Sequence, residues 1–248
     1  MDEGPQTRVV EPAGSLGWRR LQIIAAVAVV ISFLVPMLIE LSLEPFLLAM
    51  AAPFIIGLLV MLRWTRVGII WLGVVSLAVL LASAPFLVDA LSHPESLADF
   101  VPLCVFTVSS LVGVIAAVPS LRSGPKTPSR SARLTAIAAG AAIVVASLAA
   151  VVAFTGIDSA PVQPGDIRLM AEDSKFLPAE IEAAAGSISV HVTNGDSTRH
   201  TFTIDELGID LSVPPNSEQR VTFDGEPGTY VFYCSLHTPG MQGELVVN

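Results

Sequence analysis

The sequence predicts a membrane α-helical bundle of about five transmembrane helices, followed by a small all-β domain with a Greek-key sandwich fold. Of its 248 residues, 52% are hydrophobic and only 14% are charged, whereas ordinary soluble domains carry roughly 25% charged residues. The long runs between residues 21 and 156 hold almost no charge, while residues 157–248 have the composition of a soluble domain. Short strand-like segments separated by turn residues fill this C-terminal part.

Five apolar runs are close to the roughly 20 residues that a helix needs to cross a bilayer. They cover approximately residues 21–39, 45–62, 68–88, 100–118 and 134–155. We therefore expect a tail at 1–20, a four-helix transmembrane region at 21–118, a basic loop at 119–133 and a fifth transmembrane helix at 134–156. The first run resembles a signal peptide because Arg19 and Arg20 precede it, but it continues through Phe33 without a small-residue cleavage pattern. We interpret it as a membrane anchor.

The charges between these runs predict an orientation. Basic residues before the C-terminal domain occur only in the tail, the second loop and the fourth loop: Arg8, Arg19, Arg20, Arg63, Arg66, Arg122, Lys126, Arg130 and Arg133. The first and third loops carry acids and no base: Glu40, Glu44, Asp89, Glu95 and Asp99. By the positive-inside rule the tail and the 119–133 loop are cytoplasmic, so five crossings place residues 157–248 on the outer, periplasmic side of a bacterial cytoplasmic membrane.

The apolar runs themselves offer little chemistry. No charged residue or histidine lies in the middle of a run, where such groups mark ion pathways or haem ligands. We interpret Met37, Met50 and Cys104 as packing residues and His93 as an exposed loop residue. Any reactive site is therefore expected in the C-terminal domain.

That domain is expected at residues 166–248, after a linker at 157–165 that contains two prolines. Alternation in SISVHVTNG places Val190 and Val192 on an inward face and His191 toward solvent. Alternation in HTFTID predicts that His200 and Phe202 point inward. About seven short antiparallel strands are expected in total.

The domain is acidic. After residue 156 there are four basic and fourteen acidic residues, a net charge of about −10. This balance argues against nucleic acid or an anionic lipid surface as a partner and favours a basic docking protein. The alternative interpretation is that the acidic surface only keeps the domain soluble.

Three potential metal ligands lie close together near the C-terminus, in YCSLHTPGMQGELVV: Cys234, His237 and Met241. His200, on another predicted strand, can supply a fourth. Cys104 lies in an apolar run, so no disulfide is expected for Cys234. Each of the four can also be a structural residue, but thiolate, thioether and imidazole together suit copper.

The stretch NGDSTRHTFTI, followed by GTYVFYCSLHTPGMQGELVV, resembles the cupredoxins, especially plastocyanin- and amicyanin-like members. The resemblance covers residues 166–248 and implies one mononuclear type 1 (blue) copper site made of His200, Cys234, His237 and Met241. It also implies that His237 lies near the surface beneath an apolar docking patch with Thr238 and Pro239. Two features depart from the family: three residues separate His237 from Met241, and Thr201 replaces the asparagine that many members have after the first histidine.

These observations predict a membrane-anchored blue copper protein that acts in one-electron transfer. Its partners are expected to be the lipid bilayer and a redox protein, such as a cytochrome or a respiratory complex. We expect no enzymatic activity, because the chain has no extra histidine cluster for a second type of copper centre. The alternatives are a protein that binds, senses or delivers copper, and a cupredoxin-like interaction module without a redox role.

Overall fold

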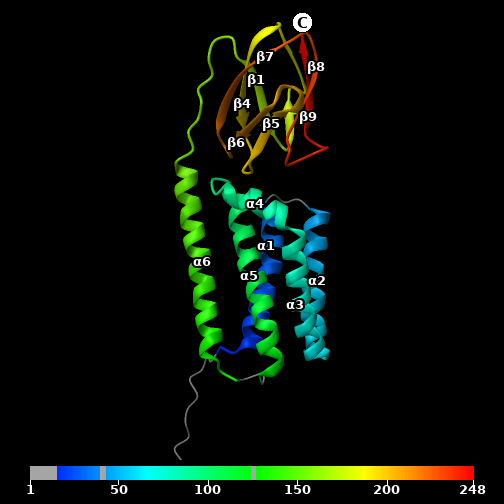
Figure 1. The fold of residues 1–248 in the computed structure, drawn as a ribbon, viewed down its shortest axis with the longest axis vertical. Helices are drawn as coiled ribbons and strands as arrows, with labels where there is room; N and C mark the ends of the chain where they lie inside the picture. The colour runs from blue at the N-terminus through cyan, green and yellow to red at the C-terminus, as the bar shows by residue number, and fades with distance from the viewer. Residues whose placement is uncertain (1–15, 40–42, 124–126) are drawn as a thin grey trace, which may run out of the picture. The chain divides into compact units, whose positions relative to one another are not determined.

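The computed structural model describes residues 16–39, 43–123 and 127–248. The helices are α1 (Trp18–Ile39), α2 (Pro45–Arg63), α3 (Thr65–Ala82), α4 (Ala84–Ser92), α5 (Leu97–Arg122) and α6 (Arg130–Thr155) (Figure 1). The chain divides into two compact units, one built from residues up to Asp89 with Pro102–Ala146, the other from Ala90–Val101 with Ser147–Asn248. Arg8, Glu40 and Lys126, which contributed to the predicted orientation, lie outside the described residues.

Five of the described helices are long and apolar enough to cross a membrane, as predicted: Trp18–Leu38, Pro45–Arg63, Thr65–Ala82, Leu97–Arg122 and Arg130–Thr155. The third prediction was wrong at its end, because the run 68–88 is not one helix. Helix α3 stops at Ala82, and α4 begins at Ala84 after the single residue Ser83. Pro85 explains the break, since proline lacks the N–H that a continuing helix needs but is accepted in the first turn of a new one.

Small residues let α2 and α3 pack closely. A Cβ atom on Gly68 would lie 2.5 Å from the Met61 Cα atom, and one on Gly57 would lie 2.5 Å from a methyl group of Leu72. Phe54 and Leu72 are almost completely buried in the same core. This is the packing expected of membrane helices, where close backbone approach replaces the hydrophobic drive available in water.

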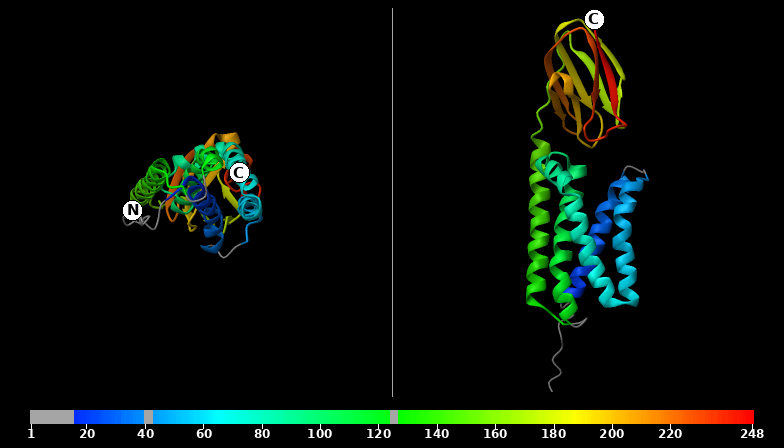
Figure 2. Two further views of the ribbon diagram at one scale, coloured as in Figure 1. Left: turned by 90° about the horizontal axis from the view of Figure 1, so that it is seen from below. Right: turned by 45° about the vertical axis from the view of Figure 1, so that its right-hand side comes forward.

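The second unit contains a β-sandwich of two sheets (Figure 2). One sheet has the order β2-β1-β4-β7 and the other the order β3-β9-β8-β5-β6. The strand bounds are β1 (Ile167–Glu172), β2 (Lys175–Leu177), β3 (Glu180–Ala183), β4 (Gly186–Asn194), β5 (His200–Ile204), β6 (Ile209–Val213), β7 (Glu218–Gly225), β8 (Gly228–Tyr233) and β9 (Gln242–Val247).

The sandwich and its inward faces agree with the prediction, but the sheets are mixed rather than antiparallel. Strand β1 runs parallel to β4, and β3 runs parallel to β9. Alternation along a strand identifies its buried face but not the direction of its partner. The short strands β2 and β3 also raise the number of described strands above the seven expected.

His191 is buried, which contradicts the expectation that it faces solvent. Only 3% of its surface is exposed, and its Nε2 lies 2.9 Å from the carbonyl oxygen of Ala160. The predicted linker covers this face of β4 and β7, since the N–H of Ala160 donates to the Glu218 carbonyl and Gln219 donates to the Asp158 carbonyl. A strand period cannot reveal that a neighbouring segment covers the polar face.

Candidate metal centre

The four predicted ligands come from three strand ends of one sheet. His200 is the first residue of β5, Cys234 directly follows β8, and His237 and Met241 lie in the loop that leads to β9. Strand β8 pairs with both β5 and β9. This pairing brings the start of β5 and the end of β8 to the same edge of the sheet.

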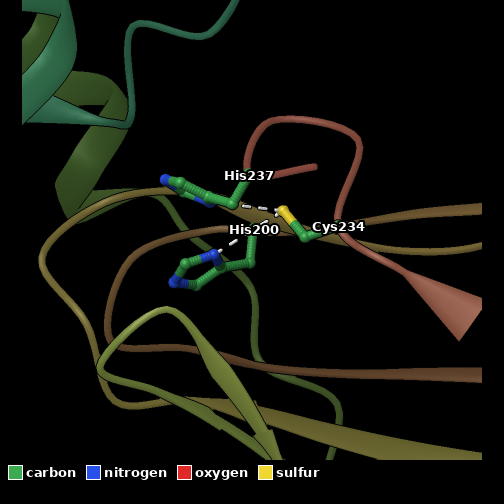
Figure 3. Close-up of side chains that lie close together, drawn as sticks. All are labelled: His200, Cys234 and His237. Atoms are coloured by element: carbon green, nitrogen blue, oxygen red, sulfur yellow. Dashed lines mark hydrogen bonds between the residues drawn. The ribbon is translucent and has the colours of Figure 1, made fainter. Parts of the chain in front are cut away.

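Three of these side chains converge (Figure 3). The ligand atoms of His200, Cys234 and His237 all lie within 4.8 Å of one another. The Cys234 Sγ atom is 3.7 Å from His200 Nδ1 and 3.5 Å from His237 Nδ1. Two imidazole nitrogens and one sulfur therefore face a common point, which is the donor set that suits copper or zinc.

Backbone hydrogen bonds hold Met241 next to Cys234 and His237. The N–H of Met241 donates to the carbonyl of His237, and the Met241 carbonyl accepts the N–H of Cys234 at 3.0 Å. Met241 is fully buried, as are Cys234 and His200, whereas His237 is half-buried. One face of the cluster therefore approaches the surface through His237.

The surroundings of Cys234 favour its thiolate form. Burial of the sulfur would raise the pKa of Cys234, but hydrogen bonds from His200, His237 and the backbone N–H groups of Thr201 and Leu236 together lower it to about 5. Burial opposes the charged form of His200, and the neighbouring Cys234 and Asp196 outweigh it and raise the pKa of that imidazole. Without a metal, these shifts favour the thiolate form of Cys234 and the charged form of His200.

Asp196 fixes the orientation of His200. Its carboxylate lies 2.7 Å from His200 Nε2, so that this nitrogen carries a proton and the ring is held with Nδ1 facing the sulfur. The same carboxylate accepts the backbone N–H groups of Asp173 and Ser174 at 2.9 and 3.1 Å. Burial raises the pKa of Asp196, but these N–H groups and His200 outweigh it, and the net pKa is lowered.

Asn194 in turn holds the loop that carries Asp196. The two N–H bonds of its side-chain amide are shared among the carbonyl oxygens of Thr198, Val213 and Pro214, and its side-chain oxygen accepts the N–H of Asp196 at 2.9 Å. The buried amide is thus completely paired, as such groups must be. It ties the loop before β5 to the end of β6.

Thr201 replaces the asparagine that the resemblance led us to look for. Its backbone N–H donates to Cys234 Sγ at 3.3 Å, and its hydroxyl accepts the backbone N–H of Ser235 at 2.9 Å. A threonine hydroxyl therefore ties the ligand loop to β5.

Sequence reasoning missed Asp196 as part of this centre. It lies four residues before His200, but the segment between them is a loop, for which spacing gives no side-chain direction. Only the folded loop brings its carboxylate to the imidazole. Cys104 lies in the helical unit, where it is buried and free, and it takes no part in the cluster.

A family model agrees with the fold of the C-terminal domain. Residues 137–247 match the family model of the cupredoxin-like domain, a range that begins inside α6. Similar solved structures include a reduced mutant of amicyanin, at 22% identity over 35% of this chain and 86% of that chain, with a TM-score of 0.30. Another is the metal-binding domain, with Cu(I), of the Cu(I)-exporting P-type ATPase of Streptococcus pneumoniae D39, at 23% identity over 38% of this chain and 97% of that chain, with a TM-score of 0.31. A third is the copper-containing nitrite reductase of Thermus scotoductus SA-01, at 24% identity over 38% of this chain and 24% of that chain, with a TM-score of 0.29.

Proposed function

Because the C-terminal part of the chain is a cupredoxin-like domain, we propose that the protein is a membrane-anchored type 1 copper protein that transfers single electrons. The observation that carries this proposal is the convergence of His200, Cys234 and His237 within 4.8 Å at one edge of the sandwich. Met241 would be the fourth ligand. When bound there, copper would supply a Cu(II)/Cu(I) couple.

The chain's own residues would hold the ligands in one arrangement for both oxidation states. Asp196 keeps His200 Nδ1 directed at the sulfur, and the Thr201 N–H is donated to that sulfur. The cluster is buried except at His237, so water reaches little of it. Electron transfer is fast where ligands need not move, and such hydrogen bonds limit their movement.

The membrane helices would keep this domain at a surface. Five helices are long and apolar enough to span a bilayer, and the charges of their loops support an orientation with the domain outside a bacterial cytoplasmic membrane. The tether would raise the local concentration of the domain near partners in the same membrane.

We propose a carrier rather than an enzyme. Among the residues that the structure describes, the cluster at His200, Cys234 and His237 is the one group of this kind, which offers a place for one ion. The partner would be a redox protein that approaches His237, where the neighbouring Leu236 is 40% exposed. A net charge of about −10 on the domain favours a partner with a basic surface.

The test is a copper titration of the full chain in detergent. A type 1 site should give an intense blue absorption band and a narrow copper hyperfine splitting in the electron paramagnetic resonance spectrum. His237→Gly should lose both signals, whereas His191→Gln, at the buried histidine outside the cluster, should keep them.

A pale spectrum of ordinary Cu(II) would overturn the type 1 assignment. Tight Cu(I) binding with slow electron self-exchange would instead favour a protein that stores or delivers copper. The self-exchange rate therefore separates these two functions even when both bind the metal.

A further inference from the structure

A chain of four side chains links the ligand loop to an exposed acid on the far side of β5. The hydroxyl of Ser235 lies 3.1 Å from that of Thr201, which lies 2.9 Å from that of Thr203. The Thr203 hydroxyl lies 2.9 Å from a carboxylate oxygen of Asp210. Both threonines are buried, while Ser235 and Asp210 are exposed.

The Asp210 carboxylate sets the direction of each hydrogen bond between these four side chains. A carboxylate can only accept, so the single proton of the Thr203 hydroxyl goes to Asp210. Thr203 must then accept from Thr201, and Thr201 must accept from the Ser235 hydroxyl. The Thr201 oxygen also accepts the backbone N–H of Ser235 at 2.9 Å, so that its one proton and two acceptor positions are all used.

This directed chain ends at the metal centre. Ser235 follows Cys234, and the N–H of Thr201 is donated to Cys234 Sγ at 3.3 Å. Without the acid, the Thr203 and Thr201 protons could point either way along the chain, and the contact between the Thr201 and Ser235 hydroxyls would lose its fixed donor. The order of the ligand loop therefore depends on the acceptor at the far end.

We propose that Asp210 is a remote positioning residue of the metal centre. Its carboxylate orients the Thr203 and Thr201 hydroxyls, and these hold Ser235 and the Thr201 N–H around the Cys234 sulfur. The inference rests on the proposed function in that the residue it positions is the thiolate ligand. Asp210 does not touch the metal site itself.

Four variants of the full chain in detergent test this, all in a Cys104→Ser background. Asp210→Ala removes the acceptor. Valine has almost the same shape as threonine, so Thr203→Val removes only the hydroxyl in the middle of the hydrogen-bond series. Asp210→Asn keeps an oxygen that can accept the Thr203 proton. Glu206→Ala removes a nearby exposed charge that is outside the chain.

The first readout needs no copper. Cys234 is completely buried, so iodoacetamide can reach it only when the ligand loop opens. We expect alkylation to be at least threefold faster in Asp210→Ala and Thr203→Val. A fifth variant, which combines Asp210→Ala with Thr203→Val, should be alkylated no faster than Thr203→Val alone, because both changes break the same series of hydrogen bonds. Asp210→Asn and Glu206→Ala should react at the parent rate.

The second readout is the midpoint potential of the copper-loaded chain. A weaker N–H contact to the sulfur favours Cu(II). We expect the ratio of Cu(II) to Cu(I) affinity to rise about threefold in Asp210→Ala, a fall of about 30 mV for one electron. Asp210→Asn should restore the parent potential, which a general loss of stability would not explain.

Parent-rate alkylation of Asp210→Ala would overturn the proposal, as would additive effects in the double variant. An equal effect of Glu206→Ala would also overturn it, because surface charge alone would then be responsible. Should the parent chain give no blue copper signal, the proposed function fails, while the alkylation rates still decide whether Asp210 orders the loop.

Discussion

The chain has two buried free cysteines, one in each unit, and their surroundings differ. Cys104 lies in α5, in a unit whose helices approach each other through small residues such as Gly68. Cys234 lies in the sandwich, where two histidines and the Thr201 N–H surround its sulfur. The same kind of side chain is thus a packing residue in one unit and a candidate metal ligand in the other.

The buried polar groups show the same difference. Among the residues that the structure describes, five buried side-chain atoms lack a hydrogen-bond partner. Four of them are in the helices, namely Arg19 Nε, Gln22 Oε1, Ser110 Oγ and Ser120 Oγ, and the fifth is Ser212 Oγ on β6. The polar side chains around Cys234 are paired, through Asp196, Asn194 and Thr201. Complete pairing is what rigidifies a polar network. The helices therefore leave several buried polar atoms unpaired, whereas the polar side chains around Cys234 form a paired network.

The difference between the two cysteines is tested most directly by exchanging the sulfur of each for oxygen. Cys234→Ser should abolish the blue absorption band completely, because the band requires a copper–thiolate bond. Cys104→Ser should leave it unchanged. Visible spectra of both variants, loaded with Cu(II) in detergent, make the measurement, and a band that survives in Cys234→Ser would remove Cys234 as the ligand.

Sequence patterns predicted the parts of this site that are encoded locally. Period-two alternation predicted that His200 points inward, and the spacing in the C-terminal loop suggested Cys234, His237 and Met241 as ligands. Asp196 and Asp210 could not be found in this way, because a loop and a cross-strand pairing bring them to the site.

The errors in the fold have the same origin. The parallel pairing of β1 with β4 and the burial of His191 under the linker both depend on segments distant in the sequence. Pro85 is the exception, since the break between α3 and α4 can be traced to a residue at the break. The five apolar spans needed no distant information, because bilayer thickness sets their length.

A titration of the Cys234 thiol measures how far its surroundings lower its pKa. In the metal-free Cys104→Ser chain, the ultraviolet absorbance of the Cys234 thiolate should appear with a midpoint near pH 5, against the ordinary value of 9.0. Burial alone would raise this pKa, so the low value depends on the hydrogen bonds from His200 and His237. A midpoint near 9 would show that these bonds do not form without metal.

The sign of the linked stability follows from this shift. An acid whose pKa is lowered in the folded state stabilises that state fully above its unfolded value, here about pH 9. The stabilisation of the metal-free domain declines as the pH falls from 9 and is gone below about 5. His200 acts in the opposite sense, because its pKa is raised in the folded state. Its contribution to the stability of the domain is complete below pH 6.5 and is lost as the pH rises through the pKa of the folded state.

Helix packing provides a smaller test from the other unit. Gly68→Leu should destabilise the helices by about 1–3 kcal/mol, because the new Cβ would meet the backbone of Met61, which cannot move aside. Gly140→Leu is the matched control, since a Cβ there meets nothing within 4 Å. Thermal unfolding followed by helical circular dichroism measures the loss. If the blue spectrum changed along with it, the two units could no longer be treated as separate in function.

The smallest expected effect concerns the pairing of Asp196 with His200. Asp196→Asn should weaken copper binding about tenfold, the lower end of what such partners contribute, because an amide cannot accept from Asp173, Ser174 and His200 together. Competition with a Cu(I) chelator measures the change. Asp224→Asn, at an exposed acid on β7, controls for the lost charge. Unchanged affinity would mean that packing alone orients the imidazole, and the pairing of the polar groups around Cys234 would then no longer explain what distinguishes this site from the helices.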